Sequence, residues 1–219
     1  MSQSTLARMA ERLNRRHRRR SAGVGLPPLI LLTDARRLAD PSTALAGLPP
    51  GAAVILRHTG TADRAALARR LKLACRRSGL LLLIAAGPGD RGLAGALAAR
   101  IGADGLHLPE RLVGRARLRR PGWLVTAAAH GPAGLRRARR ADADAALLSP
   151  VYPTDSHPGA PTLGPLRFAA WAWRAPLPVY ALGGVNAVTA RRLAASNAAG
   201  LAGIGFALGS GLSQKPGGR

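Results

Sequence analysis

The sequence predicts a single-domain α/β protein, a closed (β/α)8 barrel of the TIM type. Eight short apolar runs alternate with segments of helical period, which is the order of elements that a small barrel uses. The runs are similarly short and similarly apolar, and none has the polar alternation of a sheet edge. An open, doubly wound sheet is the alternative, because it also alternates strands with helices. The 219 residues suffice for one sizeable core.

The apolar runs set the expected boundaries. Strands are expected at residues 29–34, 54–58, 80–85, 105–108, 123–130, 145–152, 179–184 and 200–207. Helical segments are expected between them, among others at residues 62–77, 93–101, 132–140 and 186–195. Residues 2–14 have apolar positions at helical spacing, so we expect a helix that closes the bottom of the barrel, with a solvated basic run at 15–20. The chain therefore divides into a basic lead-in helix and tail (1–25), the barrel (26–209) and a flexible C-terminal tail (210–219).

The composition is strongly basic, with 33 lysines and arginines against 10 aspartates and glutamates, a formal net charge of +23. Such a balance suggests a nucleic-acid binder. The arginines recur in separate helical segments, however, and the aromatic residues that stack on single-stranded bases make up only 3% of the chain. A nucleic-acid partner is therefore not expected and biased composition is the simpler cause, although the basic N-terminal run leaves an RNA-binding alternative open.

No apolar run approaches the roughly 20 residues that span a bilayer. The N-terminus also lacks the charged-then-apolar order of a secretory signal. The single cysteine, Cys75, lies in a helical segment and excludes a disulfide or a zinc cluster within one chain. These observations predict a cytoplasmic protein, in a reducing compartment and without a membrane partner.

Barrel geometry brings the carboxyl ends of all strands to one mouth, so residues distant in the sequence become neighbours. The residues expected there are Thr33, Asp34, Arg57, His58, His107, Glu110, His130, Thr154, Asp155, Ser156, His157, Gly183, Gly184, Gly203 and Gly205. Neighbours in a strand point to opposite faces, so only one of Arg57 and His58 is expected to reach the interior. We assign Arg57 to a phosphate or carboxylate contact and expect His107 to have a packing role.

His130 ends the fifth strand after three alanines that leave room at the mouth. A neutral imidazole there could shuttle a proton, and the alternative is a structural histidine. Thr154, Ser156 and His157 lie in the sixth-strand turn between two prolines, whose rings stiffen the backbone. They are candidates for substrate binding, and the alternative is an ordinary proline-rich connection.

Two pairs of glycines follow the last two strands. Gly183 and Gly184 follow the seventh, and Gly203 and Gly205 lie at the eighth, where barrels commonly bind a phosphate with backbone N–H groups and a helix N-terminus. Asn186 is expected to cap the helix after the seventh strand. The alternative is that these glycines only permit tight turns.

Six segments occur together in the order and spacing of a known family: Thr33-Asp34, Gly102 to Leu108, Ala129-His130, Ser149 to Thr154, Leu182 to Val185, and Gly203 to Gly205. Over about residues 28–208 the chain resembles the thiamine phosphate synthase/TenI family of (β/α)8 proteins. For the synthase, the resemblance implies that hydroxymethylpyrimidine diphosphate loses pyrophosphate with the help of Mg²⁺. A thiazole phosphate then traps the resulting cation. In the TenI branch a histidine moves a proton to aromatise a thiazole carboxylate phosphate.

Several positions depart from the synthase pattern. Arg57 alone remains of one polar set, Arg111 stands at a metal-binding carboxylate position, and His157 stands where the family has a lysine. The loop after the third strand offers only Asp90 in place of an Asn-Asp pair. Mg²⁺ needs several oxygen ligands and a diphosphate needs cations around it, so both would be poorly held. His130, in contrast, aligns with the histidine of the TenI branch.

The sequence therefore favours a TenI-like tautomerase acting on a thiazole phosphate. A thiamine phosphate synthase and a catalytically degenerate, phosphate-binding barrel are the alternatives. No metal site is assigned, and Mg²⁺ is the one cofactor to expect if synthase activity is retained. The expected partner is a small phosphorylated thiazole or pyrimidine substrate, and a homo-oligomer is left open.

Overall fold

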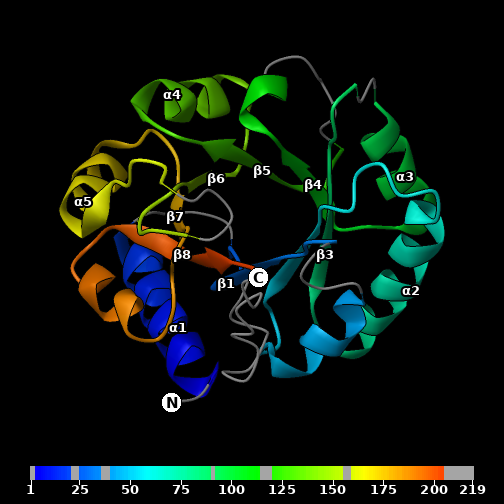
Figure 1. Ribbon diagram of the computed structural model, residues 1–219, viewed down its shortest axis with the longest axis horizontal. Helices are drawn as coiled ribbons and strands as arrows, with labels where there is room; N and C mark the ends of the chain where they lie inside the picture. Colours follow the sequence, from blue (N-terminus) through cyan, green and yellow to red (C-terminus); the bar gives the residue numbers. More distant parts are fainter. Residues whose placement is uncertain are drawn as a thin grey trace, which may run out of the picture.

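Eight parallel strands close into a barrel in sequence order, as the sequence predicts (Figure 1). The computed structural model describes residues 3–20, 25–35, 40–89, 92–113, 120–154 and 159–204. The strands are β1 (Leu29–Leu32), β2 (Ala53–Leu56), β3 (Leu81–Ala85), β4 (Gly105–Leu108), β5 (Leu124–Ala129), β6 (Ala145–Leu148), β7 (Val179–Leu182) and β8 (Ala198–Gly203). The ring closes where β1 pairs with β8, with Leu29 opposite Leu201 and Leu31 opposite Gly203.

Helices surround the barrel and connect its strands (Figure 1). They are α1 (Gln3–Arg20), η1 (Pro41–Gly47), α2 (Arg64–Arg77), α3 (Leu93–Ile101), η2 (Glu110–Leu112), α4 (Pro132–Arg140), α5 (Gly164–Arg174) and η3 (Thr189–Leu193), where η marks a 3-10 helix. Among the described helices, none combines the length and the apolar composition that crossing a membrane requires.

The core has two layers because alternate strand residues face opposite sides. Ile30, Leu83 and Leu147 belong to the inner cluster that fills the barrel. Leu82, Leu106 and other strand residues join the outer cluster, which packs against the helices. The small alanines on the helices let them approach the strands closely, so a chain with few aromatic residues still forms a dense core.

Helix α1 packs in the outer layer beside β8, because Leu6, Ala10 and Leu13 belong to the cluster between the strands and the helices. The expected closure of the bottom of the barrel by this helix stays a prediction. The buried Asn14 side chain donates from Nδ2 to the carbonyls of Leu26, at 3.2 Å, and Ala199, at 2.7 Å. These residues lie beside the beginnings of β1 and β8, so the contact attaches the helix where the ring closes.

Several expected boundaries differ from the structure, and the differences at α1, β6 and η3 have clear causes. The basic run at 15–20 continues α1, and within it Arg16 donates to the carbonyl of Ala194 at 2.7 Å. β6 ends at Leu148 and not at residue 152, because Pro150 has no N–H for the ladder. The helix expected at 186–195 is only the short η3, whose start is fixed by Asn186: its Oδ1 accepts from the backbone N–H of residues 188 and 189, each at 2.9 Å.

Two carboxylates at the amino-terminal end of the barrel are structural. Asp104 accepts from the backbone N–H of Leu82 at 2.7 Å and pairs with Lys72, whose Nζ lies 2.7 Å from its Oδ2. Asp144 accepts from the N–H of Val125 at 2.7 Å. Both residues directly precede strands, so they bind the beginnings of neighbouring strands and are far from the open mouth.

Candidate functional site

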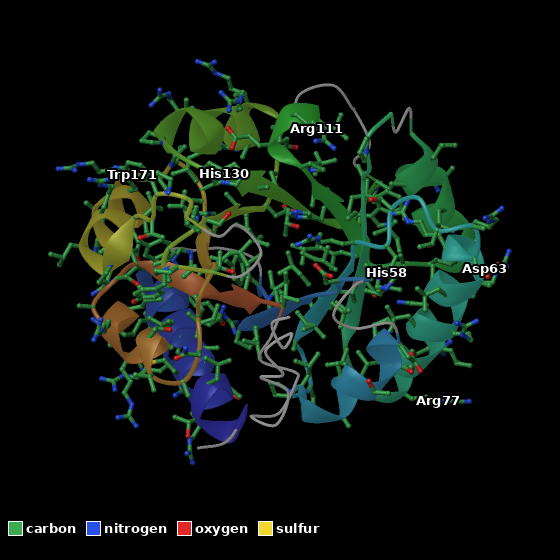
Figure 2. The ribbon with its side chains drawn as sticks, viewed as in Figure 1. His58, Asp63, Arg77, Arg111, His130 and Trp171 are labelled. Carbon is green, nitrogen blue, oxygen red and sulfur yellow. The ribbon has the colours of Figure 1, made fainter. Side chains whose placement is uncertain are left out.

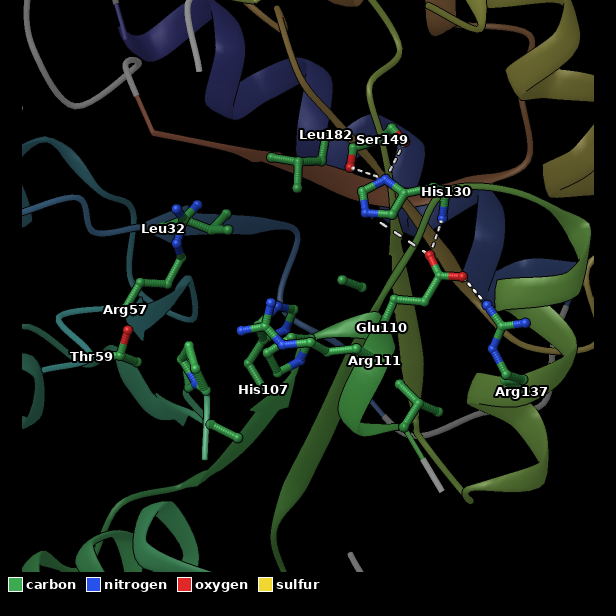
Figure 3. Close-up of a pocket in the computed structure, with 16 residues that line it drawn as sticks. Leu32, Arg57, Thr59, His107, Glu110, Arg111, His130, Arg137, Ser149 and Leu182 are labelled. Atoms are coloured by element: carbon green, nitrogen blue, oxygen red, sulfur yellow. Dashed lines mark hydrogen bonds and ion pairs between the residues drawn. The ribbon is translucent and has the colours of Figure 1, made fainter. Parts of the chain in front are cut away.

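A cavity of about 1090 Å³ opens at the carboxyl end of the barrel (Figure 3). Its lining is formed by Leu32, Arg57, Thr59, Ala85, Ala86, Pro88, His107, Pro109, Glu110, Arg111, Val113, Ala128, His130, Arg137, Ser149 and Leu182. These residues come from the ends of β1 to β7 and from the segments that follow them, so the mouth gathers distant parts of the sequence as a closed barrel requires.

His130 follows β5 and has a fixed orientation. Its Nδ1 lies 2.9 Å from the carbonyl oxygen of Ser149 and 3.4 Å from the Ser149 hydroxyl. Because a carbonyl oxygen only accepts hydrogen bonds, Nδ1 must carry the hydrogen, and the neutral ring keeps its lone pair on Nε2. The side chain is 60% exposed. The contact with Ser149 therefore leaves Nε2 accessible to a ligand in the cavity.

Glu110 lies beside the free nitrogen of this histidine. Its Oε2 is 3.9 Å from His130 Nε2 and accepts from the His130 backbone N–H at 2.9 Å. Its Oε1 pairs with Arg137 of α4. The carboxylate also fits only because residue 134 is glycine, since a Cβ there would lie 2.8 Å from Oε1. Glu110 is thus held in one place beside His130 Nε2.

His107 lies at the floor of the cavity and not in the outer layer. Its Nδ1 contacts the Thr126 hydroxyl at 3.0 Å, and its neighbours Leu106 and Leu108 pack outward. Burial, with a smaller effect from the guanidinium of Arg57, lowers the pKa of His107 to about 3. The side chain is therefore neutral at physiological pH. Its place in the cavity adds a ligand-facing surface to the packing role that the sequence suggested.

Arg57 and His58 point in different directions after β2. Arg57 lines the cavity, and its guanidinium is 4.0 Å from Asp34. His58 is buried, and its Nδ1 contacts the Thr33 hydroxyl at 2.9 Å. The same hydroxyl accepts from the backbone N–H of Arg57 at 3.0 Å, which fixes the start of the loop. The structure thus brings Arg57 to the cavity with His130 and keeps His58 out of it.

Comparison with known proteins assigns this geometry to a family. The sequence profile described as thiamine monophosphate synthase matches residues 29–206, which include every strand of the barrel. This chain belongs to the thiamine monophosphate synthase family.

Among curated relatives, the thiamine-phosphate synthase of Myxococcus xanthus is 40% identical over 101 residues, which are 44% of this chain and 46% of that protein. The thiamine-phosphate synthase of Mycobacterium bovis is 38% identical over 96 residues, 42% of this chain and 43% of that protein. The chain thus spans about half the length of these relatives. The thiamine phosphate pyrophosphorylase of Pyrococcus furiosus has the same fold, with a TM-score of 0.62 at 22% identity over 81% of this chain and 85% of that chain.

The residues described here do not fit the Mg²⁺ ion that synthase chemistry in the thiamine monophosphate synthase family implies. No group of three histidine, cysteine, aspartate or glutamate side chains converges in the described part of the chain. Glu110 is paired with Arg137, and Asp34 lies near Arg57. A third cation, Arg111, lines the same cavity. Asp90 lies outside the described residues.

The expected phosphate-binding residues are only partly described. Gly183 and Gly184 have φ of 93° and 62°, and they also allow a close packing contact: a Cβ on Gly184 would lie 2.3 Å from the carbonyl oxygen of Pro153. Gly203 ends β8, and its neighbour across the ring is Leu31. Leu182, directly before Gly183, lines the cavity together with His130, so the seventh-strand turn and the histidine share one mouth. Gly205 lies outside the described residues.

The substrate-binding candidates of the sixth-strand turn are also only partly described. Thr154 follows β6 and is half-buried, and it is not among the residues that line the cavity. Ser156 and His157 lie outside the described residues. Their roles stay predictions.

Sequence reasoning missed two contributors to the site, Ser149 and Arg137, and placed a third, Glu110, at the mouth without a role. Ser149 orients His130 through a backbone carbonyl, which leaves no signal in the residue type. Arg137 is one of several arginines on α4, and nothing in the sequence separates it from the others. Glu110 carried the one available signal, because a single acidic residue follows β4 in a chain where acids are rare.

Figure 2 shows Arg111 near His130 on this side of the molecule, whereas Asp63 and Arg77 mark the two ends of the outer helix α2.

Proposed function

We propose that this chain acts on a thiazole phosphate and transfers a proton within it, as a tautomerase of the TenI type. The carrying observation is the fixed tautomer of His130, whose Nδ1–H is bound to the Ser149 carbonyl while Nε2 is open to the cavity. A base for proton transfer needs this arrangement, namely a lone pair that is accessible and a ring that cannot turn away.

The proposed step is balanced within one substrate. His130 Nε2 removes a proton from one atom of the thiazole carboxylate phosphate and becomes an imidazolium, and it returns the proton to another atom of the same ring. Glu110, at 3.9 Å, stabilises the positive charge while it exists, and Arg137 keeps the carboxylate in place. The enzyme ends the cycle as it began, so no oxidant or cofactor is required.

Binding is assigned to the remaining predicted residues. The backbone N–H groups at Gly183, Gly184, Gly203 and Gly205 would hold the phosphate, as glycine turns at late barrel strands do. Thr154, Ser156 and His157 would orient the ring, and Arg57 would contact an anionic group from the cavity wall. A ligand fixed at these points would present its ring to His130, which is how positioning lowers a barrier.

A second candidate is thiamine phosphate synthase, which is favoured by the names of the curated relatives. That reaction releases a diphosphate, and its departure needs concentrated positive charge, supplied in the family by Mg²⁺. The substitution of Arg111 at a metal-binding carboxylate position counts against it. A third candidate is a barrel that binds a phosphorylated ligand without turnover, in keeping with the lost carboxylate and the histidine at position 157.

Two assays on the purified full-length chain separate the candidates. One supplies the thiazole carboxylate phosphate tautomer, and the other supplies hydroxymethylpyrimidine diphosphate, thiazole phosphate and Mg²⁺. We expect aromatised product in the first assay only. His130→Gln should then lower kcat on the order of 100-fold or more while KM changes little. Product in the second assay only would establish the synthase, and binding without product in either would leave the non-catalytic barrel.

A further inference from the structure

One guanidinium group in the cavity, that of Arg111, has no counter-ion among the described residues. Of the described residues that line the cavity, Arg57, Arg111 and Arg137 are basic and Glu110 alone is acidic. Arg137 pairs with Glu110, and Arg57 lies 4.0 Å from Asp34. Arg111 forms no hydrogen bond or ion pair with any other residue that the structure describes. The cavity therefore has an excess of positive charge, which concentrates anions within it.

The position of Arg111 in the ring is specific. The residue belongs to η2, directly after β4. In the closed ring β4 is four strands away from β8 in either direction, so the two strands are opposite each other. His130 follows β5, beside β4. Figure 3 shows the Arg111 side chain pointing from η2 into the cavity that His130 also lines.

A ligand that contacts the late glycines and His130 must therefore extend toward Arg111. If its phosphate lies at the ends of β7 and β8 and its reacting ring lies at His130, its far end approaches the wall after β4. A guanidinium there is a planar fork of N–H donors, whose geometry matches a carboxylate through two parallel hydrogen bonds. The ligand that fits has two anionic ends, one on each side of the mouth.

We propose that Arg111 binds a second oxyanion of the ligand, a carboxylate, and does so without a metal ion. The position of the phosphate and the role of His130 are taken from the proposed function, on which this inference rests. The assignment replaces metal binding at the end of β4 with a direct guanidinium contact. It also makes Arg111 a determinant of specificity, because a ligand without the carboxylate would leave this charge unpaired in the cavity.

The test is calorimetric titration of the full chain with thiazole-2-carboxylate, a planar probe that carries a carboxylate and no phosphate. Titrations are run in EDTA and in Mg²⁺, on the natural chain, on Arg111→Ala and on Arg136→Ala. Arg136 is an exposed arginine of α4 that does not line the cavity, and it serves as the matched control for lost charge. Inorganic phosphate is titrated in parallel, and thermal unfolding verifies that both variants are folded.

We expect Arg111→Ala to weaken binding of the carboxylate probe on the order of 10- to 100-fold, the usual loss for a charge-assisted contact. Arg136→Ala should bind like the natural chain, EDTA should have no effect, and phosphate binding should change little in either variant. Equal affinities for Arg111→Ala and Arg136→Ala would overturn the proposal, as would a requirement for Mg²⁺. An equal loss of phosphate and carboxylate binding in Arg111→Ala would overturn the assignment to a carboxylate.

These outcomes are independent of turnover. Failure of the proposed tautomerase activity would appear as absent product while the carboxylate probe still binds through Arg111. Failure of the present inference would leave turnover and affinity in Arg111→Ala equal to those of the natural chain.

Discussion

Gly134→Ala is the sharpest test of the Glu110 and His130 arrangement, because it acts on Glu110 without changing any polar group. A Cβ at this position would lie 2.8 Å from Glu110 Oε1, 3.0 Å from its Cδ and 3.2 Å from the Ala129 Cβ. The α4 backbone is confined by β5 at this buried position, so the carboxylate must move. Its displacement removes the hydrogen bond to the His130 N–H and weakens the pair with Arg137.

The magnitudes separate stability from catalysis. Losing a charged hydrogen bond costs about 1.5 to 3 kcal/mol, and the half-exposed ion pair contributes at most about 1 kcal/mol. Alanine in a helix recovers about 1 kcal/mol relative to glycine. The free energy of unfolding should therefore fall by roughly 0.5 to 3 kcal/mol. Moving a carboxylate away from an exposed His130 Nε2 removes about 1 kcal/mol of attraction, which lowers kcat roughly five-fold.

The assay is a double-mutant cycle of Gly134→Ala and Glu110→Ala, with urea unfolding and the kcat of the proposed tautomerisation measured for each variant. In the Glu110→Ala background the clash is absent. Gly134→Ala should then have no effect on kcat and should be neutral or stabilising by up to about 1 kcal/mol. If Gly134→Ala lowers kcat equally in both backgrounds, or leaves it unchanged in the natural chain, Glu110 does not support His130.

Three further predictions concern titration and packing. The pKa of His107 in the folded chain is lowered to about 3, whereas a histidine in the unfolded chain binds a proton below about pH 6.5. The unfolded chain therefore holds one more proton between these pH values, and the free energy of unfolding falls as the pH drops from about 6.5 toward 3. His107→Asn should remove up to about 1.4 kcal/mol per pH unit of that slope, measured by urea unfolding at several pH values. Gly184→Ala should lower Tm by roughly 4 to 8 °C, because φ at this residue is 62° and the new Cβ would lie 2.3 Å from a carbonyl oxygen. Gly51→Ala is the control and should lower Tm less, because φ is 80° there but the space around the new Cβ is open. Asn14→Ala leaves two carbonyls without their donor and should destabilise by about 2 kcal/mol, with faster hydrogen exchange confined to α1 if the reasoning holds.

The fold could be predicted because the strands are buried on both faces. Such strands appear as continuous apolar runs, and their alternation with Ala- and Arg-rich helices is visible without any contact information. The boundaries were less certain because each run ends in polar residues that leave the ladder. Thr33 is one example, since its hydroxyl binds the N–H of Arg57 after the strand has ended. The helix expected at 186–195 is shorter in the structure, η3, because its first turn is held by the side chain of Asn186, which accepts from two backbone N–H groups.

The site could be predicted only where the barrel rule applies. That rule places His130 and Arg57 at the mouth from sequence position alone, and the structure has both in one cavity. His107 could face either side of β4, depending on the register of the strand. The alternation of side chains along the sequence does not determine that register. The interaction of Glu110 with Arg137 joins two segments that come together only through packing of α4. Long-range contacts of this kind leave no local pattern in the sequence.

The same geometry explains why restoring one carboxylate would not restore a metal site. Arg111→Asp would return an acidic side chain after β4, but Glu110 would still be paired with Arg137 and Asp34 would still face Arg57. Mg²⁺ requires several oxygen ligands with near-octahedral geometry, so the cations at these two acids would also have to change. Proton transfer requires less, because one oriented imidazole with a nearby negative charge suffices. A barrel of this family that replaced the carboxylate at position 111 could therefore keep a tautomerisation while losing the diphosphate chemistry, and regaining the latter would take several coordinated substitutions.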